Sequence, residues 1–174
     1  KDYANVFGGI PNLKCNFELI HVMFKPDAIE ENLVNKIIND LSSLGAIVID
    51  KFEYYLSDEQ VRVIYPDITD EKIFLLIKEY LSGKKTVHCV FKGPLGTHNL
   101  FNKRKGKVGL GGHGIRMKYI KKYTKLNAEE WQMWLEGRHE KQDILDKEMF
   151  CHNLIHVAND QMSSCKGLDI IYKS

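Results

Sequence analysis

The sequence lacks the features that would mark a membrane protein, a disulfide-rich secreted domain or a nucleic-acid-binding protein. Its apolar runs are shorter than the roughly 18 residues of a membrane-spanning helix, and it shows no signal-peptide pattern. The four cysteines have no CxxC or zinc-ligand spacing. A net charge of +2 gives no reason to expect a nucleic-acid partner. We therefore expect a cytoplasmic protein that binds neither nucleic acid nor membrane.

What is present is ordinary for a globular protein. The chain has 174 residues, of which 44% are hydrophobic and 28% charged, which suits one domain with a sizeable core. We find no internal repeat and treat 1–174 as a single domain. Residues 1–16 contain glycines, a proline and little periodicity, which predicts an extended arm. Because the chain begins at Lys1 rather than methionine, we expect the native N-terminus to lie upstream.

Hydrophobic periodicity divides the rest of the chain into strands and helices. Strands are predicted over 18–25, 46–55 and 86–91, with Gly93-Pro94 breaking the third, and a short fourth strand carries His156. Helices are predicted over about 27–44, from 57 toward 65, over 71–81, in 127–150 and over 161–166, followed by an apolar tail. The order βαββαβ favours an α+β, ferredoxin-like antiparallel sheet with helices on one face.

Three capping boxes are predicted to begin helices: Asp27 with Glu30, Ser57 with Gln60, and Asn127 with Glu130. The third box opens the segment 121–150, which holds both tryptophans. We expect this segment to be a helical insertion of one or two helices that lies on the ferredoxin-like body, with Trp131 or Trp134 on the protein's own surface.

Several cationic residues lie where a polyanion could bind. Lys25 ends the first strand, and Lys107 and Arg116 lie in the basic, glycine-rich segment 96–116, where backbone amides can also approach phosphate oxygens. The glycines match neither GxxxxGK[ST] nor a GxGxxG after a strand, so this is not a Walker or dinucleotide-binding loop. On the residues alone, solvated surface charge stays open as an alternative, above all for 103–105.

A histidine near the C-terminus is a candidate nucleophile. His156 follows the apolar pair Leu154-Ile155 and precedes a polar turn, so packing would hold the ring from below and leave it open above. An unprotonated imidazole placed in this way can carry a covalent intermediate. Taken alone, the residue is better explained as a partly buried histidine that ends a strand.

Five motifs, in order over residues 18–172, resemble those of the nucleoside diphosphate kinase family. They are Phe24-Lys25-Pro26-Asp27-Ala28-Ile29, Tyr65 followed by Asp67, Gly106-Lys107-Val108-Gly109-Leu110-Gly111, Gly114-Ile115-Arg116, and Asn153-Leu154-Ile155-His156 with Asn159-Asp160. Five motifs in the right order are far more specific than any one of them.

The resemblance implies a phosphohistidine mechanism. His156 would accept the γ-phosphate of a nucleoside triphosphate and pass it to a nucleoside diphosphate. The family's other roles would fall on Lys25 and Tyr65 for the transferring phosphoryl group, Lys107 and Arg116 for the other phosphates, Asn153 for the ribose, and Phe74, Ile77 and Phe150 for the base. Mg²⁺ would bridge the phosphates with few or no direct protein ligands.

The sequence departs from the family around the histidine. The family's serine two residues after the histidine is Ala158, and its glutamate on the last helix is Gly167 by gap-free counting. Its glycine after the histidine is Val157, and an arginine is replaced by Lys107. Without an orienting partner, His156 should turn over slowly, and restoring Ala158→Ser with Gly167→Glu should recover part of the rate.

Two other functions stay open. The chain could be a divergent, non-catalytic nucleotide-binding or scaffold module, as in some cilium-associated relatives, with a cytoskeletal or ciliary location. It could also transfer phosphate from the same histidine to another acceptor. A homo-oligomer or larger assembly is compatible with the resemblance, but the rebuilt loop between 96 and 116 gives no basis for assuming a hexamer.

Overall fold

The structure is a computed structural model that describes residues 16–120 and 126–173. The predicted arm, apart from Asn16, and the first residues of the predicted insertion lie outside this part of the chain. In the described residues, no helix is both long and apolar enough to cross a membrane.

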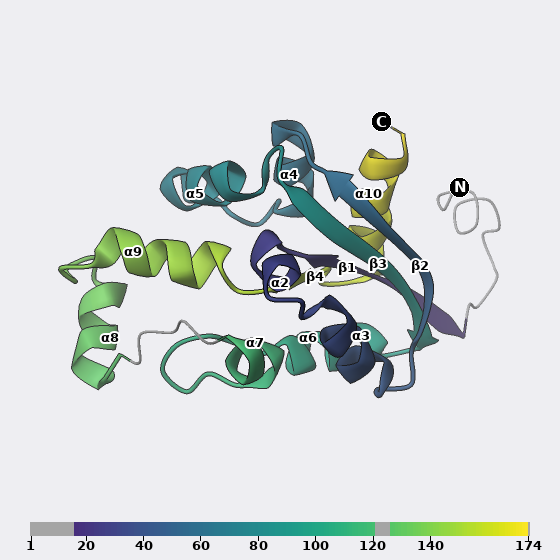
Figure 1. Ribbon diagram of the computed structural model, residues 1–174, viewed down its shortest axis with the longest axis horizontal. Coiled ribbons are helices and arrows are strands. Elements are labelled where there is room, and N and C mark those ends of the chain that lie inside the picture. The colour runs from purple at the N-terminus through teal and green to yellow at the C-terminus, as the bar shows by residue number, and fades with distance from the viewer. Residues whose placement is uncertain (1–15, 121–125, 174) are drawn as a thin grey trace.

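One antiparallel sheet organises the fold (Figure 1). Its strands, in the spatial order β2-β3-β1-β4, are β2 (Ile47–Tyr55), β3 (Lys85–Pro94), β1 (Phe17–Phe24) and β4 (Ile155–Val157). This confirms the ferredoxin-like α+β prediction. The break predicted at Gly93-Pro94 is wrong, because both residues pair with β1; Pro94 is the last residue of its strand, where a missing N–H costs little.

Helices cover both faces of the sheet rather than one. Ile20, Val22 and Phe24 point into a core shared with helix α3, whereas Met23 points into a core shared with helices on the other side. The helices of the first layer are α2 (Pro26–Glu30), α3 (Val34–Ser42), α6 (Thr97–Lys105) and α7 (Gly114–Tyr119); those of the second are α4 (Asp58–Ile64), α5 (Glu71–Leu81) and α10 (Gln161–Tyr172). Both layers bury apolar surface, which explains why β1 is buried along most of its length.

Two of the three predicted capping boxes are confirmed, at Ser57 and Asn127. The third is wrong: Lys25 is the N-cap of α2, and the Asp27 carboxylate instead accepts a hydrogen bond from the backbone N–H of Leu154 at 3.0 Å. The predicted first helix is also split into α2 and α3, because Asn32 adopts a left-handed φ of 55° between them.

Other helix boundaries differ from the sequence predictions. Segment 96–116, expected to be a flexible loop, contains all of α6 and the start of α7. Gly96, with φ of 92°, supplies the turn between β3 and α6. The apolar tail after residue 166 continues α10 to Tyr172, because Leu168 and Ile171 pack into the two cores on that face of the sheet.

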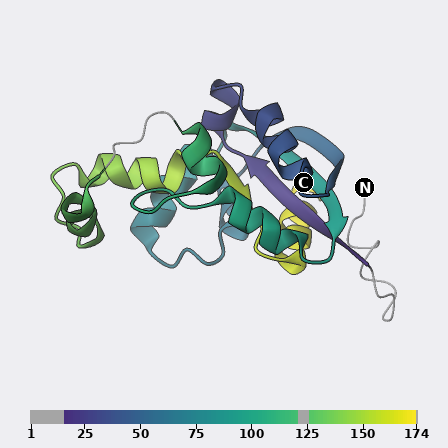
Figure 2. The same ribbon diagram turned by 90° about the horizontal axis from the view of Figure 1, so that it is seen from below.

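The insertion forms three short helices at one end of the molecule (Figures 1 and 2): α8 (Ala128–Leu135), α9 (Gln142–Asp146) and the π-helix η1 (Lys147–Cys151). Trp134 donates from Nε1 to Asp146 Oδ1 at 2.9 Å and lies 6.0 Å, ring to ring, from Phe150. Lys72 of α5 forms ion pairs with Asp143 and Asp146, each at 3.5 Å. The tryptophan therefore packs on the protein's own surface.

Candidate active site

His156 lies at the wall of a cavity of about 600 Å³ between the end of α4 and the start of α10. The register of β4 on β1 pairs His156 with Met23, so the ring projects from the sheet face that α4 and α10 cover. Tyr65, the C-cap of α4, lies against it with 4.6 Å between ring centroids. The imidazole is half-buried, so it is less open to solvent than the sequence alone suggested.

The protein holds His156 in the neutral form. Burial lowers the pKa of His156 well below its ordinary value, and the positive charges of Lys105, Lys25 and Arg116 lower it further. A neutral ring keeps one nitrogen lone pair free at pH 7, which a nucleophile requires.

Tyr65 brings an unused hydroxyl to the same place. Its Oη is buried and has no hydrogen-bond partner among the described residues. Burial raises the pKa of this hydroxyl, so it stays protonated and can donate. A buried polar group without a partner is costly unless a ligand satisfies it.

Lys25 is buried almost completely, with 1% of its surface exposed. Its Nζ donates to the backbone oxygens of Phe150 and Cys151, both at 3.1 Å, and to Asn153 Oδ1 at 2.8 Å. Burial, followed by the neighbouring Arg116 charge, lowers its pKa to about 7. Its positive charge is therefore only partly developed at neutral pH.

Asn153 forms hydrogen bonds with both Lys25 of the first motif and Arg116 of the fourth. Its Oδ1 accepts from Lys25 and, at 3.2 Å, from Arg116 Nη2. Its Nδ2 donates to the backbone oxygens of Met149 and Phe150. Arg116 also donates to the backbone oxygens of Asn153 and Ile155 and so braces the turn that leads into β4.

That turn is held in a conformation that side chains rarely adopt. Leu154 has φ of 69°, and its backbone oxygen accepts from Lys25 N at 2.9 Å while its N–H donates to Asp27. A strained backbone persists only where the surroundings over-determine it. The first and last motifs, 127 residues apart in the chain, thus fix each other beside His156.

Lys105, and not Lys107, is the lysine of the glycine-rich segment whose charge acts on His156. Lys105 ends α6, and burial followed by the Arg116 charge lowers its pKa to about 8. Its Nζ donates to Asn102, whose side chain reaches the backbone oxygen of Ala158 beside the cavity. Lys107 is exposed in the following loop.

If α6 had been predicted as a helix, Lys105 would have been found as a candidate site residue. Phe101 and Lys105 are four residues apart and share one helix face, and Phe101 is fully buried in the core. The basic run 103–105 concealed this periodicity, because its other two members are solvent-exposed as predicted.

No family model matches the sequence, and no curated protein matches it either. The fold, however, matches solved structures across most of the chain. A nucleoside diphosphate kinase from Borrelia burgdorferi, solved as a transition-state mimic with vanadate and ADP, aligns over 89% of this chain and 86% of its own, with a TM-score of 0.64 and 13% identity. The chain has the nucleoside diphosphate kinase fold.

Two further structures agree. The nucleoside diphosphate kinase of Aquifex aeolicus aligns over 89% of this chain and 94% of its own, with a TM-score of 0.60 and 15% identity. A nucleoside diphosphate kinase family protein from Babesia bovis aligns over 88% and 86%, with a TM-score of 0.61 and 13% identity. At such low identity the likeness shows the fold alone. The chemistry must be argued from the residues of this chain.

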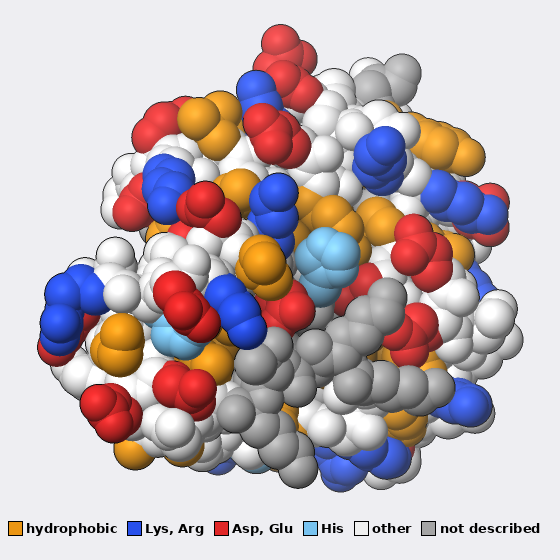
Figure 3. All heavy atoms as spheres, turned by 60° about the vertical axis from the view of Figure 1, so that its left-hand side comes forward, with side chains coloured by type: hydrophobic (Ala, Val, Ile, Leu, Met, Phe, Trp, Pro, Cys, Tyr) orange, Lys and Arg blue, Asp and Glu red, His pale blue; other side chains and the backbone are white. Residues whose placement is uncertain are grey.

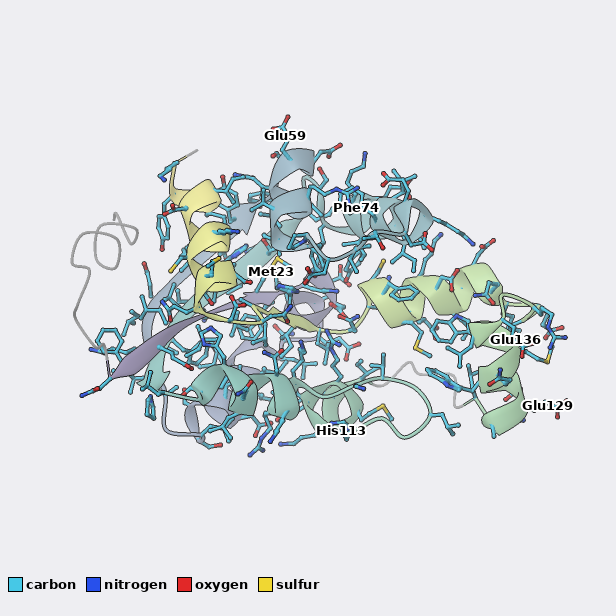
Figure 4. All side chains as sticks on the ribbon, turned by 180° about the vertical axis from the view of Figure 1, so that it is seen from behind. Met23, Glu59, Phe74, His113, Glu129 and Glu136 are labelled. Atoms are coloured by element: carbon cyan, nitrogen blue, oxygen red, sulfur yellow. The ribbon has the colours of Figure 1, made fainter. Side chains whose placement is uncertain are left out.

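Within this nucleoside diphosphate kinase fold, the residues predicted to hold a base are buried or half-buried. Phe74 lies on α5 (Figure 4) and is buried in the core. The Cζ of Arg62 lies over its ring, 3.1 Å from the centroid. Ile77 is buried in the same core. Phe150 is half-buried against Trp134 and supplies its backbone oxygen to Lys25.

The face that carries the insertion and α5 has no single sign of charge. Figure 3 shows acidic and basic side chains mixed on it, with hydrophobic side chains between them. Lys25 is buried and Lys105 and Arg116 are half-buried, so water screens their charges on His156 less than it screens charges on this face.

Proposed function

We propose that this chain is a nucleoside diphosphate kinase-like phosphotransferase that works through phospho-His156. The observation that carries the proposal is the neutral His156 ring beside the unsatisfied Tyr65 hydroxyl, with the charges of Lys25, Lys105 and Arg116 acting on it. Solvated surface charges would not surround a half-buried imidazole in this way.

The transfer would proceed in two displacements. A lone pair of the His156 imidazole attacks the γ-phosphorus of a nucleoside triphosphate, a P–N bond forms, and the bond from phosphorus to the β–γ bridging oxygen breaks to release the diphosphate. A second nucleoside diphosphate then attacks the phosphohistidine and restores the free ring. Little else is needed besides positioning and neutralisation of the oxygens.

The surrounding residues have distinct proposed roles. Tyr65 donates its hydroxyl to the transferring phosphoryl group, and Lys25 and Lys105 neutralise it. Arg116 contacts another phosphate of the nucleotide, and together with Asn153 it also holds Lys25 and the β4 turn in place, which their hydrogen bonds already do. Lys107, in the exposed loop, is left for the more distant phosphates.

Mg²⁺ would reach the site with the nucleotide. In residues 16–120 and 126–173, no group of three or more His, Cys, Asp or Glu side chains is arranged to hold a metal ion. Asp67 lines the cavity that contains His156 and bonds to Asn159 at 3.2 Å, so its carboxylate fits a contact to water on a phosphate-bound cation. Magnesium would add charge neutralisation, and the protein residues would supply orientation.

One observation favours the alternative of a non-catalytic nucleotide-binding or scaffold module. The three Lys25 contacts and three of the Arg116 contacts are to acceptors of the protein itself. A phosphate must compete with these acceptors, whereas a catalytic site is usually pre-organised for its ligand. Phosphohistidine transfer to an acceptor other than a nucleotide is the third candidate.

Labelling distinguishes these functions. Incubation with γ-labelled ATP and magnesium should give acid-labile, base-stable label on the wild type, which a nucleoside diphosphate discharges. His156→Ala should abolish the label, and His152→Ala, a matched control at an exposed histidine outside the cavity, should keep it. Tight ATP binding without label would favour the binding module, and label that diphosphates cannot discharge would favour another acceptor.

A further inference from the structure

A row of buried polar side chains runs through the sheet to the His156 cavity. The hydroxyl of Thr86 contacts His88 Nε2 at 2.8 Å, and His88 Nδ1 contacts His21 Nε2 at 2.8 Å. The two imidazoles stack with 5.1 Å between centroids, and none of the three residues is more than 2% exposed. His21, at the end of the row, lines the same cavity as His156.

The row has a defined hydrogen-bond direction. The Thr86 hydroxyl donates its single proton to the backbone oxygen of Tyr54 at 2.9 Å. It can therefore only accept a hydrogen bond from His88. His88 must then carry its proton on Nε2 and accept on Nδ1, and His21 must carry its proton on Nε2. Neutral His21 is thereby left with an unprotonated Nδ1.

Burial keeps both rings neutral. It lowers the pKa of His21 to about 4, and it lowers the pKa of His88 well below its ordinary value, with a further contribution from His21. The direction of the row is therefore maintained at neutral pH.

The unprotonated Nδ1 of His21 lies beside Ala158 and Gly167, the two positions where the kinase family has a serine and a glutamate. It makes no hydrogen bond to a described residue, and a Cβ added to Gly167 of α10 would lie 3.0 Å from it. Across the sheet, the backbone N–H of Ala158 donates to His21 O at 3.1 Å. Two positions without polar side chains, Ala158 and Gly167, thus lie beside the His21 ring, whose Nδ1 can accept a hydrogen bond from the cavity.

The strand register brings His21 and His156 onto one face. His156 pairs with Met23, and His21 lies two residues before Met23 in β1. Diagonal neighbours on one face of an antiparallel pair are separated by roughly 7–8 Å between Cα atoms, within reach of aromatic side chains. Both rings enter the same cavity.

We propose that His21 is a positioning residue for His156: its Nδ1 accepts a hydrogen bond from the protonated ring nitrogen of His156 through one water in the shared cavity. This leaves the other His156 nitrogen unprotonated for attack on phosphorus, and it rests on the proposed phosphotransfer. The Thr86–His88–His21 row would select the tautomer of the reacting ring. In other enzymes an acidic side chain has this role, whereas here the groups are neutral.

The proposal reverses one expectation from the sequence. Gly167→Glu was expected to restore an orienting group, but its Cβ alone would crowd His21 Nδ1. The His21 ring would have to shift by a few tenths of an ångström to accommodate the glutamate, so we expect Gly167→Glu to disturb the positioning of His156 rather than to restore it.

The direct test is the tautomer of His156, read from the ¹⁵N chemical shifts of its ring at neutral pH. We expect one tautomer to dominate in the wild type and a mixture in His21→Leu. His21→Asn, which keeps an amide near the Nδ1 position, should recover most of the preference. Thr86→Val removes the acceptor that directs the row and should shift the ratio without touching the cavity.

His98→Gln is the matched control. His98 is also buried, and it bonds to Glu18 and Ser164 beside the same strand but is not part of the row. His98→Gln should lower the free energy of unfolding by about as much as His21→Leu and leave the His156 tautomer unchanged.

Kinetics supply the second readout. In a single turnover with γ-labelled ATP, His21→Leu should slow labelling of His156 by about tenfold to a thousandfold with ATP affinity unchanged, and His21→Asn should recover part of the rate. If His21→Leu does not fold, His21→Asn and Thr86→Val decide. A His156 tautomer that is identical in the wild type and all the folded variants would overturn the proposal. A wild type that takes no label but whose tautomer depends on His21 would instead refute the phosphotransfer alone.

Discussion

Two lysines whose charges act on His156, the buried Lys25 and the half-buried Lys105, have pKa values lowered toward neutrality. Burial, with Arg116 as the next contribution, lowers the pKa of Lys25 to about 7 and that of Lys105 to about 8. His156 titrates well below its ordinary range and stays neutral across the same interval. Changes in activity above pH 6 should therefore report the lysines rather than the nucleophile.

ATP affinity should fall as pH rises from 6 to 9. A bound polyphosphate favours charged lysines, so binding above about pH 7 must take up protons that Lys25 and Lys105 have lost. We expect a loss of about tenfold or more, since one pKa unit corresponds to about 1.4 kcal/mol. Calorimetry in two buffers of different ionisation enthalpy would detect the uptake. Lys25→Met should flatten the dependence, and Lys107→Met, at an exposed position, should not; buffer-independent heats would contradict the prediction.

Arg116→Ala should lower both binding and stability. Loss of a charge-assisted phosphate contact in a partly desolvated site costs about 2–4 kcal/mol of ATP binding. The substitution also removes the donors to Asn153 and Ile155 that hold the β4 turn, for which we expect a further about 1–3 kcal/mol of unfolding free energy. Calorimetry and denaturant unfolding separate the two effects. Equal ATP affinity for variant and wild type would show that the guanidinium only braces the turn.

At the scale of elements, the glycine loop between α6 and α7 contacts the insertion, in addition to the ion pairs between the insertion and α5. Gly109, with φ of 90°, lies against the ring of Trp131 in α8, where a Cβ would be 2.1 Å from a ring carbon. Gly111, with φ of 74°, has open space at its Cβ position. Trp131 and Trp134 contact each other at 4.9 Å, so the loop, α8 and η1 are in continuous contact.

Gly109→Ala should therefore destabilise the protein more than Gly111→Ala. Both substitutions place a side chain at positive φ, which costs about 1–2 kcal/mol, but only the first also meets an aromatic ring. Thermal unfolding of the two variants measures the difference. Adding Trp131→Ala should relieve Gly109→Ala specifically. Equal melting temperatures for the two single variants would mean that the loop and α8 do not rest on each other in solution.

At the scale of the whole molecule, the His156 site lies between the helices of one layer and the sheet at its shortest strand, β4. Its three residues pair with the end of β1, and the site occupies the space beyond them. Assembly into oligomers, the single-domain boundary at 1–174 and the roles of the site residues stay predictions.

Nucleotide, rather than metal alone, should stabilise the fold. Because the described residues offer no cluster for a bare metal ion, chelation of divalent ions should leave the melting temperature of the ligand-free protein unchanged. ATP with magnesium at about a hundred times its dissociation constant should add about 2.7 kcal/mol, or roughly 5–10 °C for a chain of this size. A drop in melting temperature on chelation without nucleotide would point to a protein-held metal.

The local patterns of the sequence predicted much of the fold. The apolar content of β1, the β-rich composition of β2 and the helical spacing of α5 predicted these elements, because such patterns are properties of neighbouring residues. Capping at Ser57 and Asn127 was readable, because each box closes within four residues. The helix over 97–105 was missed, because its glycine and lysine neighbours hide the buried face that Phe101 begins.

The sequence by itself determined the fold class and the candidacy of His156, because alternation, helical spacing and short motifs are properties of neighbouring residues. Only the tertiary structure decided that Lys105 rather than Lys107 acts on the ring, that Lys25 is bound by acceptors of the protein itself, and that His21 lies against Gly167. These are contacts between residues up to about 145 positions apart. Which side chains meet there depends on how the helices pack on the sheet, and no local pattern records that.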